Sequence, residues 1–201
     1  MLIVLSVIFA FLCGSIPSGY LLCKKLKGID IRTMGSGNIG STNVKRILGA
    51  KLAVYTQIFD IAKALVPVSL AYCINYKYNI GISDSLYYCL VGFSAILGHN
   101  YTPFLSFNGG KGVNTTMGAF FLMTPIATLL GVTVYFVMKP FVKTVAIRSM
   151  SLGFTIPAVS YLLKVDNTVV LFSFIAAILL VIRHKKNIKQ IIESRKSNKD
   201  I

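Results

Sequence analysis

Carboxylates are scarce in this sequence. Its 201 residues include only six Asp and Glu, against 21 Lys and Arg, and the formal net charge is +15. Because Mg²⁺ and Ca²⁺ are held mainly by carboxylate oxygens, we expect no metal site. The four cysteines lie in or beside apolar runs, with no Cys-x-x-Cys pair and no Cys/His cluster. This pattern argues against a disulfide framework and a zinc site, and no cofactor is predicted.

Several catalytic signatures are also missing. The chain has no Walker-type phosphate loop, because Gly112 follows Lys111 where Ser or Thr is required. It lacks the HxxxxD pattern of one acyltransferase class and the DxxDG pattern of CDP-alcohol phosphotransferases. No serine stands in a recognisable Ser-His-Asp arrangement. If the protein transfers an acyl group, direct attack on a preactivated donor is therefore favoured over a covalent acyl-enzyme.

Long apolar runs place the chain in a membrane. They cover residues 1–22, 52–74, 86–97, 115–138, 150–163 and 168–182. A helix needs about 20 mostly apolar residues to span a bilayer. We interpret the first run as a retained span, since no basic segment precedes it. A nucleic-acid partner is not expected, because a soluble basic domain with interleaved aromatics is absent.

The basic residues predict the orientation. Lysines and an arginine at 24–32 assign the first loop to the cytoplasm and the N-terminus to the outside. Splitting the run 115–138 at Thr124–Pro125 keeps the later basic segments cytoplasmic as well. The predicted fold is all-α and polytopic, with about seven transmembrane helices, some short, and a cytoplasmic C-terminus. We expect a single domain over 1–193 and a disordered tail over 194–201.

A polar, glycine-rich stretch at 35–46 reads GSGNIGSTNVKR. Its glycines allow close approach to the main chain, its hydroxyls and amides offer donors, and its last two residues are cations. We predict an anion site, most simply for phosphate. The alternative is a flexible polar loop. The candidate ligand-binding residues here are Ser36, Gly37, Asn38, Asn43 and Arg46.

A second glycine-rich stretch, FNGGKGVNTT at 107–116, has the same physical character. Gly109, Gly110 and Gly112 free the backbone, and Lys111 brings a cation to an anionic ligand. The alternative is a basic turn that flanks the membrane. Together with residues 148–149 and 184–187, the two stretches are predicted to share one membrane face. That face supplies cations, hydroxyls and amides, and almost no carboxylate.

Two ionisable residues interrupt the second apolar run. Asp60 and Lys63 are three residues apart and so lie on one helix face. Ionisable groups inside a span are costly and are usually paired or functional. We expect an internal ion pair that supports the site, in preference to direct chemistry.

Three segments resemble the motifs of the bacterial acyl-phosphate:glycerol-3-phosphate acyltransferase (PlsY) family: GSGNIGSTNVKR, GHNYTPFLSFNGGKGVNT and HKKNIKQII. The resemblance implies a seven-helix inner-membrane enzyme with a cytoplasmic active site. Such an enzyme acylates the sn-1 hydroxyl of glycerol 3-phosphate from an acyl-phosphate, which yields lysophosphatidate and inorganic phosphate and begins phospholipid synthesis. The membrane lipid and a soluble enzyme that makes the acyl-phosphate are the implied partners.

The resemblance also implies roles for individual residues. Ser36 and Arg46 match phosphate-binding positions, Lys111 the lysine of the second motif, and Ser149 a serine of a later cytoplasmic segment. His184 and Asn187 match the pair that holds the glycerol hydroxyls. The sequence departs from the family pattern at Ser41, Asn108 and Asn114.

Two other functions remain open at this point. One is a membrane transporter of an organophosphate anion, although only one broken helix is found where transporters often show matching pairs. The other is a non-catalytic membrane subunit whose polar stretches are interaction loops. The clustering of glycine, cation and hydroxyl on one face favours the acyltransferase.

Overall fold

The computed structural model describes residues 1–78 and 80–197, and this part of the chain is helical without strands. In chain order the helices are α1 (Leu2–Ser15), α2 (Ser18–Lys27), η1 (Ile31–Thr33), α3 (Ser41–Leu48), α4 (Ala50–Lys77), α5 (Asp84–Asn100), η2 (Pro103–Leu105), α6 (Val113–Phe120), α7 (Pro125–Val137), α8 (Val145–Leu162), α9 (Asn167–Arg183) and α10 (Lys185–Ser197). The predicted all-α class is confirmed.

Length and composition identify fewer unbroken spans than the sequence predicted. Within the described residues, α4 and α8 are each long and apolar enough to cross a membrane. The pairs α1–α2 and α9–α10 pass the same test only when each is counted as one bent span, with bends of 40° and 54°. Helix α7 is apolar but shorter. The short helices agree with the expectation that some spans need tilt or shelter among their neighbours.

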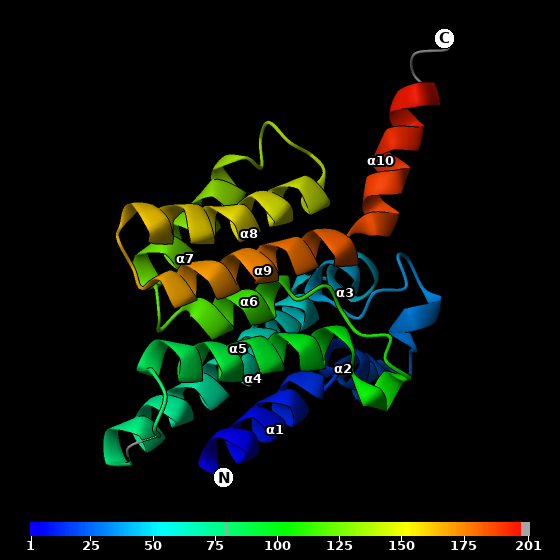
Figure 1. Ribbon diagram of the computed structural model, residues 1–201. Helices are drawn as coiled ribbons and strands as arrows, with labels where there is room; N and C mark the ends of the chain where they lie inside the picture. The colour runs from blue at the N-terminus through cyan, green and yellow to red at the C-terminus, as the bar shows by residue number, and fades with distance from the viewer. Residues whose placement is uncertain (79, 198–201) are drawn as a thin grey trace.

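The helices run between two ends of the bundle (Figure 1). One end gathers the C-terminal part of α2, η1, α3, η2, the start of α8 and the α9–α10 junction. The N-terminus and the α4–α5, α6–α7 and α8–α9 turns lie at the opposite end. We call the first the site end, because the four polar clusters predicted to share a face all lie there.

Prolines explain two of the breaks. Helix α1 ends at Ser15 and α2 begins at Ser18, so Pro17 stands in the gap. Pro125 is the first residue of α7, after α6 has ended at Phe120. Proline lacks an N–H and favours the first turn of a helix over its interior. The predicted split at Thr124–Pro125 is confirmed.

Two helix boundaries within the bundle differ from the prediction. The lysines at 24–27 belong to α2, which ends only at Gly28 with a φ of +67°. Arg148 and Ser149, expected in a loop, lie inside α8 and are 6% and 4% exposed. The cation is accommodated there by stacking 4.8 Å above the Tyr135 ring.

The C-terminal helix also extends further than expected. Helix α10 continues to Ser197, into the stretch 194–201 for which disorder was predicted. No Gly or Pro occurs between 185 and 197 to end it. Residues 198–201 of that predicted tail lie outside the described residues.

Close helix crossings depend on glycine. A Cβ added at Gly14 of α1 would overlap the carbonyl of Ala95 in α5, and one at Gly98 of α5 would overlap the carbonyl of Phe11. A Cβ added at Gly118 of α6 would likewise overlap the carbonyl of Ile61 in α4. Small residues allow such backbone contacts in membrane bundles, where packing replaces the hydrophobic driving force. These crossings pack α1 against α5 and α4 against α6.

Candidate functional site

Lys111 connects two elements that are distant in the sequence. It follows Gly110 in the loop before α6, and its Nζ donates a hydrogen bond to Oδ1 of Asn187 in α10. Both side chains are half-buried. The structure therefore brings together two predicted site residues from the second and third motifs.

Positive charge accumulates around Lys111. Burial lowers the pKa of its ammonium first, and the charges of Arg46 and Arg183 lower the pKa further. Within the described chain, none of these three cations forms a salt bridge with a carboxylate. Cations that converge without a negative partner suit an anionic ligand, since phosphate needs positive charge and donors.

The Gly109–Gly110 pair acts differently from the prediction. Gly109 N–H donates to the Asn100 carbonyl over 3.2 Å, and Gly110 N–H donates to the His99 carbonyl over 3.0 Å. These two N–H groups are therefore committed within the protein and are not free to hold an anion. The need for glycine is steric: a Cβ at Gly110 would overlap the His99 ring, and one at Gly109 the His99 carbonyl. Gly112 has a φ of +84° and precedes α6.

Arg183 is a residue of the site that no motif in the sequence predicted. It ends α9, and its Nε and Nη2 donate to the carbonyls of Gly110 and Gly109, each over 3.1 Å. Its guanidinium also stacks 4.9 Å above the Tyr101 ring. Arg183 thus fixes the position of the two glycines next to Lys111. Its place at the end of an apolar run, beside His184, was the available signal.

Within segment 35–46, two predicted ligands shape the loop. Asn43 is buried, and its Nδ2 donates to the carbonyls of Met34 and Ile31 over 2.9 and 3.3 Å. Its Oδ1 accepts from the Ser36 N–H over 2.9 Å. Oδ1 of Asn38 accepts from the Gly40 N–H, also over 2.9 Å. The Asn43 amide is therefore committed to the backbone through both Nδ2 and Oδ1, whereas Asn38 uses its Oδ1 to hold the turn.

The remaining candidates of this segment are more accessible. Ser36 is exposed at the loop, and Arg46 is exposed on α3. Gly37 has a φ of +67°, and a Cβ there would lie 2.9 Å from the Arg32 carbonyl oxygen. The conformation of the turn thus requires glycine at this position, whereas Ser36 and Arg46 are free to meet a ligand.

His184 and Asn187 lie on either side of a helix junction. His184 is buried at the end of α9, where its Nδ1 pairs with the Leu180 carbonyl over 2.8 Å. The Asn187 N–H donates to the His184 carbonyl over 2.9 Å. The two residues stay neighbours although the helix bends instead of continuing. Burial lowers the pKa of the His184 ring, and the nearby Lys111 ammonium lowers it further.

Ser149 has a weaker connection to the cluster. It is buried in the first turns of α8, which begins at the site end. No hydrogen bond joins it to Lys111, His184 or Asn187 in the part of the chain described. The structure thus brings it to the correct end without showing a contact.

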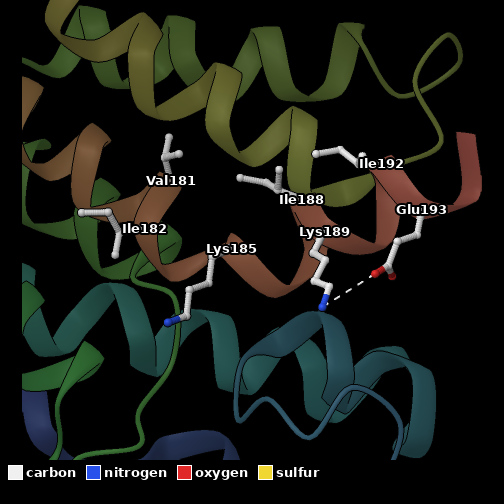
Figure 2. A pocket seen from close by; sticks show the side chains of 7 residues that line it. All are labelled: Val181, Ile182, Lys185, Ile188, Lys189, Ile192 and Glu193. Atoms are coloured by element: carbon white, nitrogen blue, oxygen red, sulfur yellow. Dashed lines mark ion pairs between the residues drawn. The ribbon is translucent and has the colours of Figure 1, made fainter. Parts of the chain in front are cut away.

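An apolar groove opens next to the Asn187 helix (Figure 2). Its volume is about 500 Å³. It is lined by Val181, Ile182, Lys185, Ile188, Lys189, Ile192 and Glu193. Lys189 and Glu193 form an exposed ion pair at 3.8 Å on its edge. The groove combines an aliphatic wall with lysines, as expected of a surface that meets an amphiphile.

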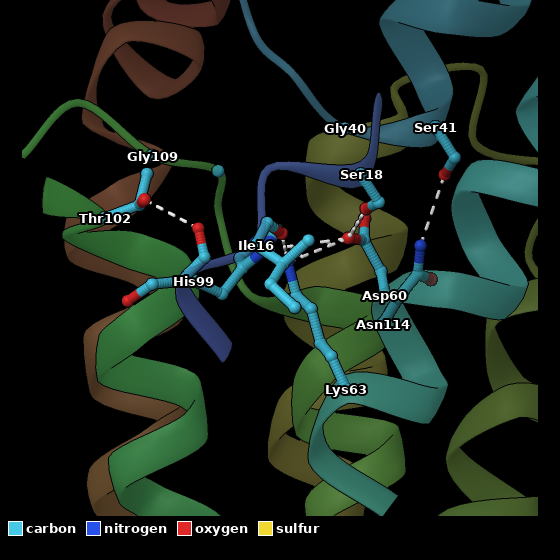
Figure 3. Close-up of polar contacts among 12 residues, drawn as sticks. Ile16, Ser18, Gly40, Ser41, Asp60, Lys63, His99, Thr102, Gly109 and Asn114 are labelled. Carbon is cyan, nitrogen blue, oxygen red and sulfur yellow. Dashed lines mark hydrogen bonds and ion pairs between the residues drawn. The ribbon is translucent and has the colours of Figure 1, made fainter. Parts of the chain in front are cut away.

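A direct hydrogen bond joins the two glycine-rich stretches. Nδ2 of Asn114, in α6, donates to Oγ of Ser41, in α3, over 3.2 Å (Figure 3). Both residues are departures from the motif pattern noted in the sequence. The structure shows that the two departures form a pair.

Comparisons with known proteins agree with this arrangement. The family model described as glycerol-3-phosphate acyltransferase matches residues 4–194. A glycerol-3-phosphate acyltransferase of Clostridium acetobutylicum is 50% identical over 193 residues, which cover 96% of this chain and 98% of that protein. One from Endomicrobium trichonymphae is 39% identical over 196 residues, covering 98% and 94%.

Two solved structures have the same fold. One is the crystal structure of PlsY (YgiH), an integral membrane glycerol 3-phosphate acyltransferase, in its glycerol 3-phosphate form. It superposes with a TM-score of 0.87 at 31% identity, over 97% of this chain and 94% of that one. The lysophosphatidic acid form of the same enzyme gives a TM-score of 0.85.

Proposed function

The chain belongs to the glycerol-3-phosphate acyltransferase family, and from that premise we propose how this acyltransferase works. The cluster of Lys111, Arg46 and Arg183 carries the proposal, because among the described residues it is a concentration of positive charge without a salt bridge to a carboxylate. It binds the phosphate of glycerol 3-phosphate and the phosphate of an acyl-phosphate donor. Ser36 adds a hydroxyl on the side of segment 35–46, and Ser149 adds one from α8.

The reaction is direct transfer between the two substrates. The sn-1 hydroxyl oxygen of glycerol 3-phosphate bonds to the acyl carbonyl carbon, and the bond from that carbon to the phosphate oxygen breaks. The departing phosphate takes the hydroxyl proton, so no strong protein base is needed. His184 and Asn187 orient the glycerol hydroxyls, while Lys111 stabilises the charge that develops on the phosphate. Lysophosphatidate and inorganic phosphate are the products.

The groove along α9 and α10 accommodates the acyl chain beside the phosphates. Its wall of Val181, Ile188 and Ile192 is apolar, and its lysines lie at the polar edge. The site end faces the cytoplasm of a bacterial inner membrane, with seven spans and the N-terminus outside. This orientation follows from the basic residues. It also gives access to a soluble enzyme that supplies the acyl-phosphate.

A phosphate-release assay on the purified protein tests the proposal. Acyl-phosphate together with glycerol 3-phosphate should release phosphate and form lysophosphatidate without CoA, ATP or added metal. Acyl-CoA is the control donor and should give no product. Turnover with acyl-CoA alone would overturn the donor assignment. Flux of glycerol 3-phosphate into sealed vesicles without acylation would instead favour a transporter.

The lowered pKa of Lys111 predicts a pH dependence. The ammonium is charged only below its pKa, so anion binding should be strong at neutral pH and weaken as the pH rises through that lowered pKa. KM for glycerol 3-phosphate should therefore rise on the alkaline side at a lower pH than an ordinary lysine would require. A Lys111→Arg variant stays charged, so its KM should stay flat over the same range. Identical alkaline profiles for the two proteins would contradict this role.

A further inference from the structure

The ion pair on α4 lies at the break in the first span. Oδ1 of Asp60 is 3.0 Å from Nζ of Lys63, and the two residues are only 3% and 8% exposed. Nζ of Lys63 also donates to the Ile16 carbonyl over 2.9 Å, and Oγ of Ser18 donates to Oδ1 of Asp60 over 2.5 Å (Figure 3). A buried pair needs such additional hydrogen bonds to offset its desolvation.

The two charges match the two helix ends that they contact. Ile16 follows the C-terminus of α1, where unpaired carbonyls carry partial negative charge, and it meets the cation. Ser18 begins α2, where the partial charge is positive, and it meets the carboxylate. Asp60 and Lys63 lie one turn apart on α4 and thus contact the two helix ends on either side of Pro17. The pair thereby fixes the direction in which α2 leaves the break.

The direction of α2 determines the position of segment 35–46. Gly19, the second residue of α2, packs so closely on Ile39 that a Cβ there would overlap the Ile39 carbonyl. Ile39 is buried in the middle of the first glycine-rich stretch. A change at the break is therefore passed through α2 to the backbone between Ser36 and Arg46.

His99 connects the same pair to the second stretch. Nδ1 of its buried ring is 3.7 Å from Oδ1 of Asp60 and has no hydrogen-bond partner among the described atoms. The opposite side of the ring, at Nε2, packs against Gly110. The His99 carbonyl also accepts the Gly110 N–H. The His99 ring therefore lies between Asp60 and Gly110, the residue before Lys111.

We propose that Asp60 is a positioning residue which, with Lys63, sets the distance between segment 35–46 and segment 109–111. The inference rests on the proposed function, since those segments are the two walls of the phosphate site. Asp60 touches neither substrate and acts through the α1–α2 break on one side and through His99 on the other. Without the Asp60 charge, each of the two segments keeps its fold, but the distance between them is no longer fixed.

Kinetics of an Asp60→Asn variant test this role. Asparagine keeps the size and one acceptor oxygen while removing the charge. We expect kcat/KM per folded molecule to fall by about 10- to 100-fold, with KM rising for both substrates, because small misplacements of binding groups slow the reaction strongly. Unchanged kcat/KM in the folded variant would overturn the proposal.

A matched control separates positioning from stability. Thr124 and Ser160 form a buried hydrogen bond of 2.9 Å at the opposite end of the bundle. A Thr124→Val variant should lower the thermal unfolding temperature and leave kcat/KM unchanged. A similar loss of kcat/KM in this control would mean that activity follows general stability, which would also overturn the proposal.

Cross-linking provides a readout that does not depend on turnover. Ser41 lies in segment 35–46 and is hydrogen-bonded to Asn114, which closely follows segment 109–111, so in a Ser41→Cys/Asn114→Cys protein without the native cysteines the rate of disulfide formation under mild oxidation reports the separation of the two walls. Adding Asp60→Asn should slow this reaction severalfold, and adding Thr124→Val should not. An equal rate with Asp60→Asn would contradict the positioning role. Inactivity of the unaltered protein would count only against the proposed function.

Discussion

Replacing Lys111 by alanine is expected to abolish turnover while the protein still folds and inserts. The substitution removes the ammonium at the centre of the cationic cluster and its hydrogen bond to Asn187. Loss of one preorganised donor at a developing negative charge typically lowers kcat by about 10²–10³. Arg46→Ala should have an effect of the same order. The measurement is phosphate release at saturating concentrations of both substrates.

The control for these variants is the lysine next to Arg46. Lys45 is exposed on α3, adjacent to Arg46, and is not among the groups that act on Lys111. Lys45→Ala removes the same formal charge from the same helix, so it should retain most of the activity. Full activity in both Lys111→Ala and Arg46→Ala would refute the assignment of this cluster as the anion site.

Replacing Gly110 by alanine should have the second largest effect. The added methyl group would overlap the His99 ring, which is held between Asp60 and the Gly110 backbone. Overpacking of this kind costs about 1–3 kcal/mol. It also displaces Lys111, so kcat/KM should fall by about 100-fold. Unfolding temperature and phosphate release, measured on the same preparation, report the two effects.

Gly153 offers a comparison within α8. A Cβ added there would meet Cδ1 of Leu180 at 3.2 Å, which is the movable end of a flexible side chain. Gly153→Ala should therefore leave both stability and turnover close to those of the unaltered protein. If Gly110→Ala behaved in the same way, the contact between Gly110 and His99 would have no role in aligning Lys111.

The patterns in the sequence predicted those features that depend on composition. Long apolar runs predicted an all-helical membrane protein, and proline chemistry predicted the break before Pro125. The distribution of Lys and Arg predicted that the polar clusters lie at one end of the bundle, because basic residues concentrate on one side of the membrane. The second and third motifs, which contain Lys111 and Asn187, were predicted to share one membrane face, and the two residues are hydrogen-bonded there.

Features that depend on tertiary contacts could not be predicted. Asn43 looked like a ligand, since nothing local shows that Ile31, Met34 and Ser36 would use all of its amide. The Gly109 and Gly110 N–H groups looked free for the same reason. Ser149 looked like a loop residue because cations usually stay outside spans, and nothing in the sequence shows that its neighbour Arg148 would stack on Tyr135 of the preceding helix, α7.

The break at Pro17 has a consequence for biosynthesis. Helices α1 and α2 leave the ribosome before α4, so the Ile16 carbonyl and the Ser18 hydroxyl meet the bilayer before their partners Lys63 and Asp60 exist. Lipid offers no hydrogen bonds to such groups. We therefore expect the first span to remain beside the insertion machinery until α4 arrives, so that the two enter the membrane as one unit.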